Sequence, residues 1–147
     1  MIKRTYPQTR LRRTRLKGFM RDLIAQHNLT TDDLIQPIFI ADQSEDKIEI
    51  PSMPGIYRHN LDSLYNEVES FIQAGIKSVA IFPAIDASKK DEDGSHALDE
   101  GNIVCSALAG LSERFPEIIK IADVALDPYT DHGHDGLLID GRVDNDE

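Results

Sequence analysis

The chain has 147 residues, a formal net charge of −10 and a hydrophobic content of 40%, which fits a single globular domain with an apolar content on the low side. No run approaches the ~20 apolar residues that a membrane span needs, and the N-terminal stretch lacks the apolar core of a secretory signal. The single cysteine, Cys105, excludes an internal disulfide and suits a reducing compartment. We therefore expect a cytoplasmic protein without a membrane partner.

The net charge conceals an asymmetry between the two ends of the chain. Eight basic residues precede the first acidic one, Asp22, whereas residues 123–147 hold eight acidic residues and one base, Arg142. A basic arm and an acidic end can meet within one chain or between subunits, or the arm can be a solvated tail. Few aromatic residues, such as Tyr6, are interleaved for stacking on bases, so we expect no nucleic-acid partner.

The first part of the chain alternates apolar patterns with polar connections. Apolar residues at helical spacing predict a helix over residues 14–27, and residues 30–33 are typical of a turn or cap. Residues 34–40 are a short apolar run that predicts a strand with an irregularity at Pro37. Residues 41–60 are polar and carry prolines and a glycine, which predicts a loop.

The alternation continues through the middle of the chain. Asn60 or Asp62 is expected to cap a helix that ends at Gly75. The elements that follow are a strand, a long charged loop, a helix and a further strand, over residues 76–82, 86–101, 103–114 and 118–126 respectively. Cys105 falls in the apolar pattern of the last helix, so we expect it in the core rather than as a nucleophile.

Strands that alternate with helices predict an α/β fold with parallel strands and crossover helices. The long loops follow the strands, at the functional end of both barrels and open α/β sheets. Residues 137–139 and the pair Asp140–Gly141 predict a hairpin. Residues 145–147 look like a helix N-cap with acidic residues behind it. Because a helix should begin there, we expect a piece of a longer protein.

The segment DVALDPYTDHGHDG, residues 123–136, concentrates carboxylates and imidazoles behind the last predicted strand. Its candidate site residues are Asp123, Asp127, Asp131, His132, His134 and Asp135. Such side chains among glycines at the carboxyl end of a strand are typical of a site for a metal ion or a polar ligand. Oxygen ligands favour Mg²⁺ or another hard cation over Zn²⁺. The alternatives are a polar loop satisfied by its own hydrogen bonds and, for Asp123, a buried structural acceptor.

Other chemistries lack their motifs in this sequence. The two histidines match the H-x-H-x-D-H pattern of a metallo-hydrolase poorly, because the aspartate directly follows the second histidine and no further histidine follows. The sequence has no G-x-S-x-G elbow, no Gly-rich phosphate loop with Lys-Ser/Thr and no G-x-G-x-x-G fingerprint. These absences disfavour a serine hydrolase and a nucleotide-binding domain.

Six stretches resemble, in order, segments of the porphobilinogen synthase family, also called 5-aminolevulinate dehydratase. They are RLRRTR (10–15), DLIQPIFI (33–40), IPSMPGIYR (50–58), GIKSVAIFP (75–83), KDEDGS (90–95) and the acidic segment itself. The resemblance implies the N-terminal part of a (β/α)8 TIM barrel, with residues 1–13 as an extended arm and residues 14–147 as the first three β/α units of an incomplete barrel. It also implies a homo-octamer assembled through the arm.

The resemblance further implies a hydro-lyase that condenses two molecules of 5-aminolevulinate to porphobilinogen in tetrapyrrole (heme) biosynthesis. Zinc-dependent members carry cysteines where this sequence has Ala125, Asp127 and Asp135. The chain therefore resembles the cysteine-free branch associated with Mg²⁺, and zinc is not expected. By position, Asp127 and Asp135 would contact the ion, and Asp123 and His134 would line the substrate pocket.

The family forms Schiff bases through two lysines on later barrel strands, beyond this sequence. Lys77 and Lys120 fall at strand starts, away from the mouth, so neither replaces them. We therefore expect the isolated chain to be inactive, and a barrel cut after three units to leave open sheet edges. The alternatives are a non-catalytic remnant that binds metal or associates with subunits, and an independent α/β metal-binding domain.

Overall fold

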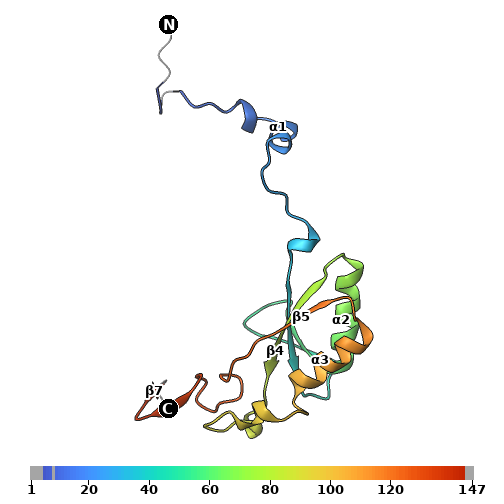
Figure 1. Cartoon of the computed structure of the whole chain (residues 1–147), viewed down its shortest axis with the longest axis vertical. Coiled ribbons are helices and arrows are strands. Elements are labelled where there is room, and N and C mark those ends of the chain that lie inside the picture. The colour runs from blue at the N-terminus through green and yellow to red at the C-terminus, as the bar shows by residue number, and fades with distance from the viewer. Residues whose placement is uncertain (1–4, 8, 145–147) are drawn as a thin grey trace. The chain divides into compact units, whose positions relative to one another are not determined.

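The computed structural model describes residues 5–7 and 9–144 (Figure 1). Contacts divide the chain into two compact units, residues 1–30 and 31–147. The helix expected at the C-terminal end, from residue 145, lies outside the described residues. None of the helices in the described part is long and apolar enough to cross a membrane.

The first unit contains less helix than the sequence predicts. A single 3-10 turn over Arg13–Arg15 precedes α1, which spans only Gly18–Leu23. The prediction of a helix over residues 14–27 is therefore wrong in length. The apolar side chains that should form its buried face, such as Phe19 and Leu23, are exposed. So short a helix is only marginally stable without a packed face, which explains why the apolar pattern does not extend it.

The second unit is built on a five-stranded sheet in the order β2-β3-β1-β4-β5. In chain order the strands are β1 Gln36–Ala41, β2 Lys47–Glu49, β3 Tyr57–His59, β4 Ser78–Ala84 and β5 Ile119–Ala122. Strands β3, β1, β4 and β5 run parallel, and β2 pairs antiparallel with β3. The expected parallel sheet is confirmed. The expected loop over residues 41–60 is wrong, because it contains β2 and β3.

Pro37 lies in β1 where the strand has no partner in β3. Pairing with β3 begins at Phe39, whereas β4 pairs along the whole of β1. A residue without an N–H is tolerated where one neighbouring strand is missing. The irregularity expected at Pro37 is therefore a local gap in pairing, and the strand continues through it.

Helices α2 (Leu61–Gln73) and α3 (Ile103–Arg114) pack against the sheet and against each other (Figure 1). The Asn60 side chain caps α2 by accepting the Ser63 N–H at 2.9 Å, so Asn60 rather than Asp62 is the cap. The helix ends at Gln73, and Gly75, directly after the C-cap residue Ala74, has a φ of 88°. The core between helices and sheet consists mainly of Ile38, Ile40, Leu64, Val68, Val79, Ile81, Ala107 and Leu111.

Two details of this layer differ from the sequence predictions. Cys105 is exposed, so its expected place in the core is wrong. Its neighbour Val104 is one of the three residues that α3 buries, with Ala107 and Leu111. The last predicted strand stops at Ala122 instead of Leu126. Within the described residues β5 pairs only with β4, and its side chains Ile119 and Ile121 are exposed, which is the open sheet edge that was expected.

A hairpin follows at residues 137–144. Strands β6 (Leu137–Ile139) and β7 (Arg142–Asp144) pair antiparallel. Asp140 and Gly141 connect them, with φ angles of 50° and 74°. Positive φ at both central residues is what a tight type I′ turn requires, so the predicted hairpin is confirmed.

Candidate functional site

Two loops at the carboxyl edge of the parallel sheet meet and form the candidate site. The first follows β4, and the second, residues 123–136, follows β5; we call the second one the acidic loop. Asp91 of the first loop and Thr130 of the second form an isolated parallel bridge. The Asp131 N–H donates to the Asp91 carbonyl at 3.0 Å, and the Asp91 N–H donates to the Tyr129 carbonyl at 3.4 Å. Main-chain pairing therefore joins the loops directly.

The acidic loop is closed by the side chain of Asp135. Its Oδ1 accepts the backbone N–H groups of Leu126 at 2.6 Å and Asp127 at 3.0 Å. Thr130 is 1% exposed and donates its hydroxyl to the His134 carbonyl at 3.0 Å. A loop that contains two glycines thus acquires a defined shape through side-chain bonds to its own backbone.

The two histidines of the acidic loop have distinct roles. Their rings stack with centroids 5.8 Å apart. The His134 backbone N–H can only donate, so the Nδ1 of His132, which lies 3.2 Å away, must accept and carries no proton. The Nε2 of His132 therefore carries the proton and donates it to the Glu92 carbonyl at 3.1 Å. His132 thus links the two loops, and the His134 side chain is exposed.

The carboxylates of the acidic loop face solvent. Asp123, Asp127, Asp131 and Asp135 are all exposed. Asp123 lies directly after the last residue of β5, so the alternative of a buried structural acceptor is wrong. The Asp135 carboxylate accepts a hydrogen bond from the backbone N–H of Asp127, so these two residues lie side by side. Among the described residues, the side chains of Asp123 and His134 have no hydrogen bond or ion pair, and the His134 ring contacts only the His132 ring.

The chemistry of these donors suits a hard cation only in part. Within residues 5–7 and 9–144, no group of three or more His, Cys, Asp or Glu side chains is arranged to hold a metal ion. Mg²⁺ usually keeps several waters and takes one or two carboxylates from the protein, a number that Asp127 and Asp135 can supply. A tetrahedral zinc site needs three or four protein ligands, which the described loop does not bring together.

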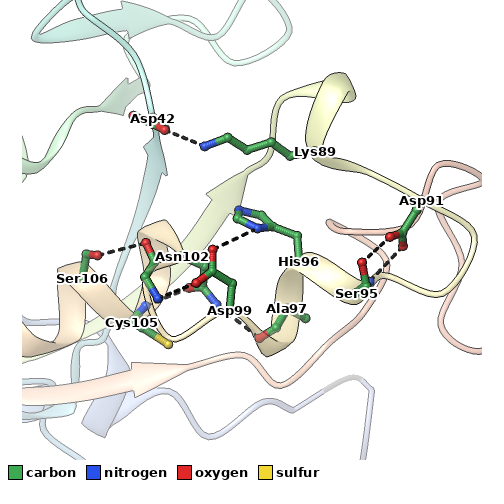
Figure 2. Close-up of polar contacts among 11 residues, drawn as sticks. Asp42, Lys89, Asp91, Ser95, His96, Ala97, Asp99, Asn102, Cys105 and Ser106 are labelled. Carbon is green, nitrogen blue, oxygen red and sulfur yellow. Dashed lines mark hydrogen bonds and ion pairs between the residues drawn. The ribbon is translucent and has the colours of Figure 1, made fainter.

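A small cavity of about 140 Å³ lies at the same carboxyl edge of the sheet, between the ends of β1 and β4 and the start of α3. Its polar lining includes Asp42, Asp86, Lys89, His96, Asn102 and Ser106. Lys89 donates to Asp42 at 2.7 Å, and this hydrogen bond raises the pKa of the lysine (Figure 2). His96 lies 3.5 Å from Asp99. The two basic side chains in the lining, Lys89 and His96, are therefore already paired with Asp42 and Asp99.

Sequence reasoning from the residues missed Asp91, Ser95 and Thr130 as parts of the site. The Asp91 carboxylate accepts both the backbone N–H and the hydroxyl of Ser95, the former at 2.8 Å (Figure 2). These bonds lower the pKa of Asp91. The available signal was the D-E-D-G-S stretch, which is typical of a turn closed by its first aspartate. The burial of Thr130 could not be predicted from the sequence, because most of the residues around it are polar or charged.

Fold and site together define an α/β protein whose polar loops meet at the carboxyl edge of a parallel sheet, the usual place of a ligand site in such folds. Residues 8–147 match the family model described as delta-aminolevulinic acid dehydratase. The chain therefore belongs to the delta-aminolevulinic acid dehydratase family, and the resemblance noted in the sequence is confirmed.

Relatives and a solved structure agree with this assignment. Over 138 residues the chain is 44% identical to the delta-aminolevulinic acid dehydratase of Bradyrhizobium diazoefficiens, covering 94% of this chain and 39% of the relative. The Chlamydia pneumoniae protein of the same name is 43% identical, covering 94% of this chain and 42% of the relative. The Toxoplasma gondii ME49 enzyme (porphobilinogen synthase), solved in complex with its reaction product porphobilinogen, superposes with a TM-score of 0.87 at 35% identity, covering 95% of this chain and 40% of that one. The chain spans about two fifths of the length of these relatives.

Proposed function

We propose that this chain is part of a porphobilinogen synthase, a lyase that condenses two molecules of 5-aminolevulinate to porphobilinogen in heme biosynthesis. The observation that carries the proposal is the family match over residues 8–147 together with the likeness to a product-bound enzyme. In the complete protein we infer that the β1-β4-β5 sheet is the first part of a TIM barrel, with residues 1–13 as an arm. A reducing compartment such as the cytoplasm suits its exposed Cys105.

Within this function, Asp123 and His134 are proposed to line the substrate pocket. Both are exposed beside the sheet mouth, where an amine or carboxylate of 5-aminolevulinate can reach them. A carboxylate attracts an ammonium group, and an imidazole can exchange a proton near neutral pH. The adjacent Asp127 and Asp135 are proposed to contact a hydrated Mg²⁺, which would supply a positive charge near the bound substrate.

Two lysines near the sheet, Lys77 and Lys89, are unsuited to Schiff-base chemistry. Lys77 precedes β4 and pairs with Asp32 at 2.6 Å, at the end of the sheet opposite the acidic loop. Lys89 lies near the mouth, but its bond to Asp42 raises its pKa, whereas a nucleophilic amine needs a lowered pKa. We propose that the reacting lysines are contributed by residues beyond these 147, and that this chain alone does not turn over substrate.

The direct test is to assay porphobilinogen formation from 5-aminolevulinate. The complete protein encoded with this sequence is expected to be active, and the 147-residue chain inactive. In the complete protein, Asp123→Asn should reduce kcat/KM by about 10²-fold or more, because it removes a charge beside the substrate. Asp131→Asn, in the same loop but outside the proposed pocket, is the matched control. An inactive complete protein, or equal effects of the two substitutions, would contradict the proposal.

The metal assignment has its own test, calorimetric titration of the complete protein with Mg²⁺ and with Zn²⁺. Mg²⁺ is expected to bind, and Asp127→Asn or Asp135→Asn to weaken its binding by about tenfold or more, because each removes one of two charged oxygen ligands. Asp131→Asn again serves as the control. Mg²⁺ binding that Asp127→Asn and Asp135→Asn leave unchanged would contradict the assignment of these two carboxylates to the ion.

Association with further copies of the chain is the second candidate role, and the exposed apolar side chains of the first unit favour it. Tyr6, Leu11, Leu16, Phe19 and Leu23 are each at least 64% exposed. Such a set marks an interaction surface, and we propose that it packs on another subunit of a homo-octamer. Light scattering should give the mass of eight copies for the complete protein, and a smaller mass after deletion of residues 1–23, which carry all five side chains. An unchanged mass after this deletion would exclude the surface.

A further inference from the structure

We propose that Asp91 is a positioning residue: its carboxylate closes the 91–95 turn, and this turn determines where the acidic loop holds Asp127 and Asp135. The inference rests on the proposed function, because it assumes that the acidic loop acts on substrate or ion. Asp91 itself does not face the proposed pocket with a free carboxylate. It acts through the main chain of the loop that follows β5.

The first step is the closure of the turn. Both carboxylate oxygens of Asp91 are engaged by Ser95, one by its backbone N–H at 2.8 Å and the other by its hydroxyl (Figure 2). The backbone N–H groups of Asp93 and Gly94 also favour the charged form of this carboxylate. A single side chain therefore holds four residues of an otherwise exposed, charged loop in one conformation.

The second step is the contact between the closed turn and the acidic loop. Gly94 is buried, with a φ of 65°, and a Cβ at this position would lie 3.4–3.5 Å from side-chain atoms of Thr130, Leu126 and Tyr129. The 91–95 turn thus lies directly against residues 126–130 of the acidic loop, the last of which, Thr130, forms the bridge to Asp91. The backbone of Asp91 completes the contact through its bonds to Tyr129 and Asp131.

The third step leads from this contact to the proposed site residues. Leu126 and Thr130 are joined by a backbone hydrogen bond of 3.0 Å, and the Leu126 N–H is also one of the two donors to Asp135. The adjacent N–H, that of Asp127, is the other donor. The bonds from Asp91 to the proposed ion-contacting pair therefore form one continuous chain of backbone and side-chain contacts.

The test compares variants of Asp91 with a matched control in the complete protein. Asp91→Ala removes both acceptors, and Asp91→Asn keeps one acceptor and can still hydrogen-bond to Ser95. Asp93→Ala removes an exposed carboxylate from the same turn whose side chain makes no bond within the described residues. We expect Asp91→Ala to raise KM for 5-aminolevulinate and to lower kcat/KM by on the order of 10²-fold, as misplacement of site residues does. Asp91→Asn should recover most of the loss, and Asp93→Ala should leave both constants unchanged.

A merely structural role predicts a different result, namely a lower melting temperature and less active protein at an unchanged KM. That result, or equal effects of Asp91→Ala and Asp93→Ala, would overturn the inference. Amide exchange on the 147-residue chain tests the positioning without activity: Asp91→Ala should speed exchange at Asp131, Leu126 and Asp127. Unchanged exchange there would also overturn the inference. If the complete protein makes no porphobilinogen while exchange responds as expected, the proposed function fails and the positioning role stands.

Discussion

The carboxylate of Asp135 accepts a hydrogen bond from the backbone nitrogen of Asp127 at 3.0 Å. The same oxygen accepts the N–H of Leu126 at 2.6 Å, so one side chain closes a loop of ten residues. Consequently the two aspartates proposed to contact an ion are brought together by the hydrogen bonds of the loop itself. Asp135 therefore has two separable roles, as a carboxylate charge and as an acceptor for backbone donors.

These two roles can be separated by substitution at Asp135. Asp135→Ala removes the acceptor, and amide exchange at Leu126 and Asp127 should become at least about fivefold faster, which corresponds to about 1 kcal/mol. Asp135→Asn keeps an oxygen acceptor and should preserve most of the protection while removing the charge. Site-resolved exchange by NMR on the 147-residue chain provides the measurement. Equal exchange in the two variants would mean that the side chain does not close the loop.

Gly110 on α3 faces Tyr65 of α2 so closely that no side chain fits between them. A Cβ at this position would lie 1.9 Å from the Tyr65 hydroxyl oxygen, and the Arg114 guanidinium covers the same ring at 4.1 Å from its centroid. Gly110→Ala should lower the free energy of unfolding by about 1–3 kcal/mol, the usual cost of overpacking, although alanine is the better helix former.

Denaturant unfolding measures this cost, and Gly18→Ala on α1 is the matched control. A Cβ at Gly18 would meet only the end of the Arg21 side chain at 3.8 Å, so the control should leave the midpoint unchanged or raise it. A Gly110→Ala chain as stable as the unaltered chain would mean that Tyr65 moves aside without cost.

The local elements of the second unit were predictable, because short-range chemistry determines them. Asn60 and Gly75 bound α2 as a cap and a left-handed terminus, and Asp140–Gly141 makes the hairpin turn. Strands β2 and β3 were missed because each has only three residues. Their order depends on pairing with each other and with β1, which no local pattern encodes. The helix expected over residues 14–27 was too long, because an apolar pattern forms a full helix only where a partner buries it.

The candidate site was predictable in its residue types but not in their roles. The cluster from Asp123 to Asp135 was recognised from the sequence, and its position beside the sheet mouth follows from parallel strands. A polar loop satisfied by its own hydrogen bonds was one of the alternatives, and the bonds of Asp135 to Leu126 and Asp127 are of that kind. That Asp135 makes them could not be inferred, since an aspartate that binds an ion and one that closes a turn have the same local sequence. The contribution of Asp91 depends on a bridge to Thr130, 39 positions further along the chain, a separation that no local spacing rule reaches.

His59 should make the stability of the chain depend on pH. The residue is buried at the end of β3, 2.7 Å from the Ser63 hydroxyl, and burial lowers its pKa from the ordinary value of 6.5. At pH values between 6.5 and the lowered pKa, the unfolded chain therefore binds a proton at His59 more readily than the folded chain does. The stabilising contribution is complete above pH 6.5 and is lost as the pH falls below it.

Urea unfolding between pH 5 and pH 8 tests this dependence. His59→Gln should flatten the slope of unfolding free energy against pH below 6.5, whereas His27→Gln, which changes an exposed histidine, should leave the slope as it is. If His59→Gln and the unaltered chain share one slope, another group is responsible.

Asn102 should stabilise the chain more than the other helix cap does. Its Oδ1 accepts the Cys105 N–H at 2.9 Å, and its Nδ2 donates to the Ala97 carbonyl at 3.2 Å. The residue is 3% exposed, so Asn102→Ala removes the partners of the Cys105 N–H and the Ala97 carbonyl, both of which lie in part-buried hydrogen bonds. The loss of the cap alone costs about 1 kcal/mol, and an unsatisfied buried group adds about 1–3 kcal/mol. We expect a total of about 2–4 kcal/mol in denaturant unfolding.

Two variants separate the parts of this effect. Asn60→Ala removes the equivalent cap of α2, whose second bond goes to the exposed Asp46 at 3.5 Å, so water can replace that bond and the cost should stay near 1 kcal/mol. Asn102→Asp keeps the acceptor for Cys105 and loses the donor to Ala97, so its cost should fall between those of the two alanine variants. If Asn102→Ala costs no more than Asn60→Ala, the bond to Ala97 adds nothing, and the end of the loop that carries the 91–95 turn is held to α3 by other contacts.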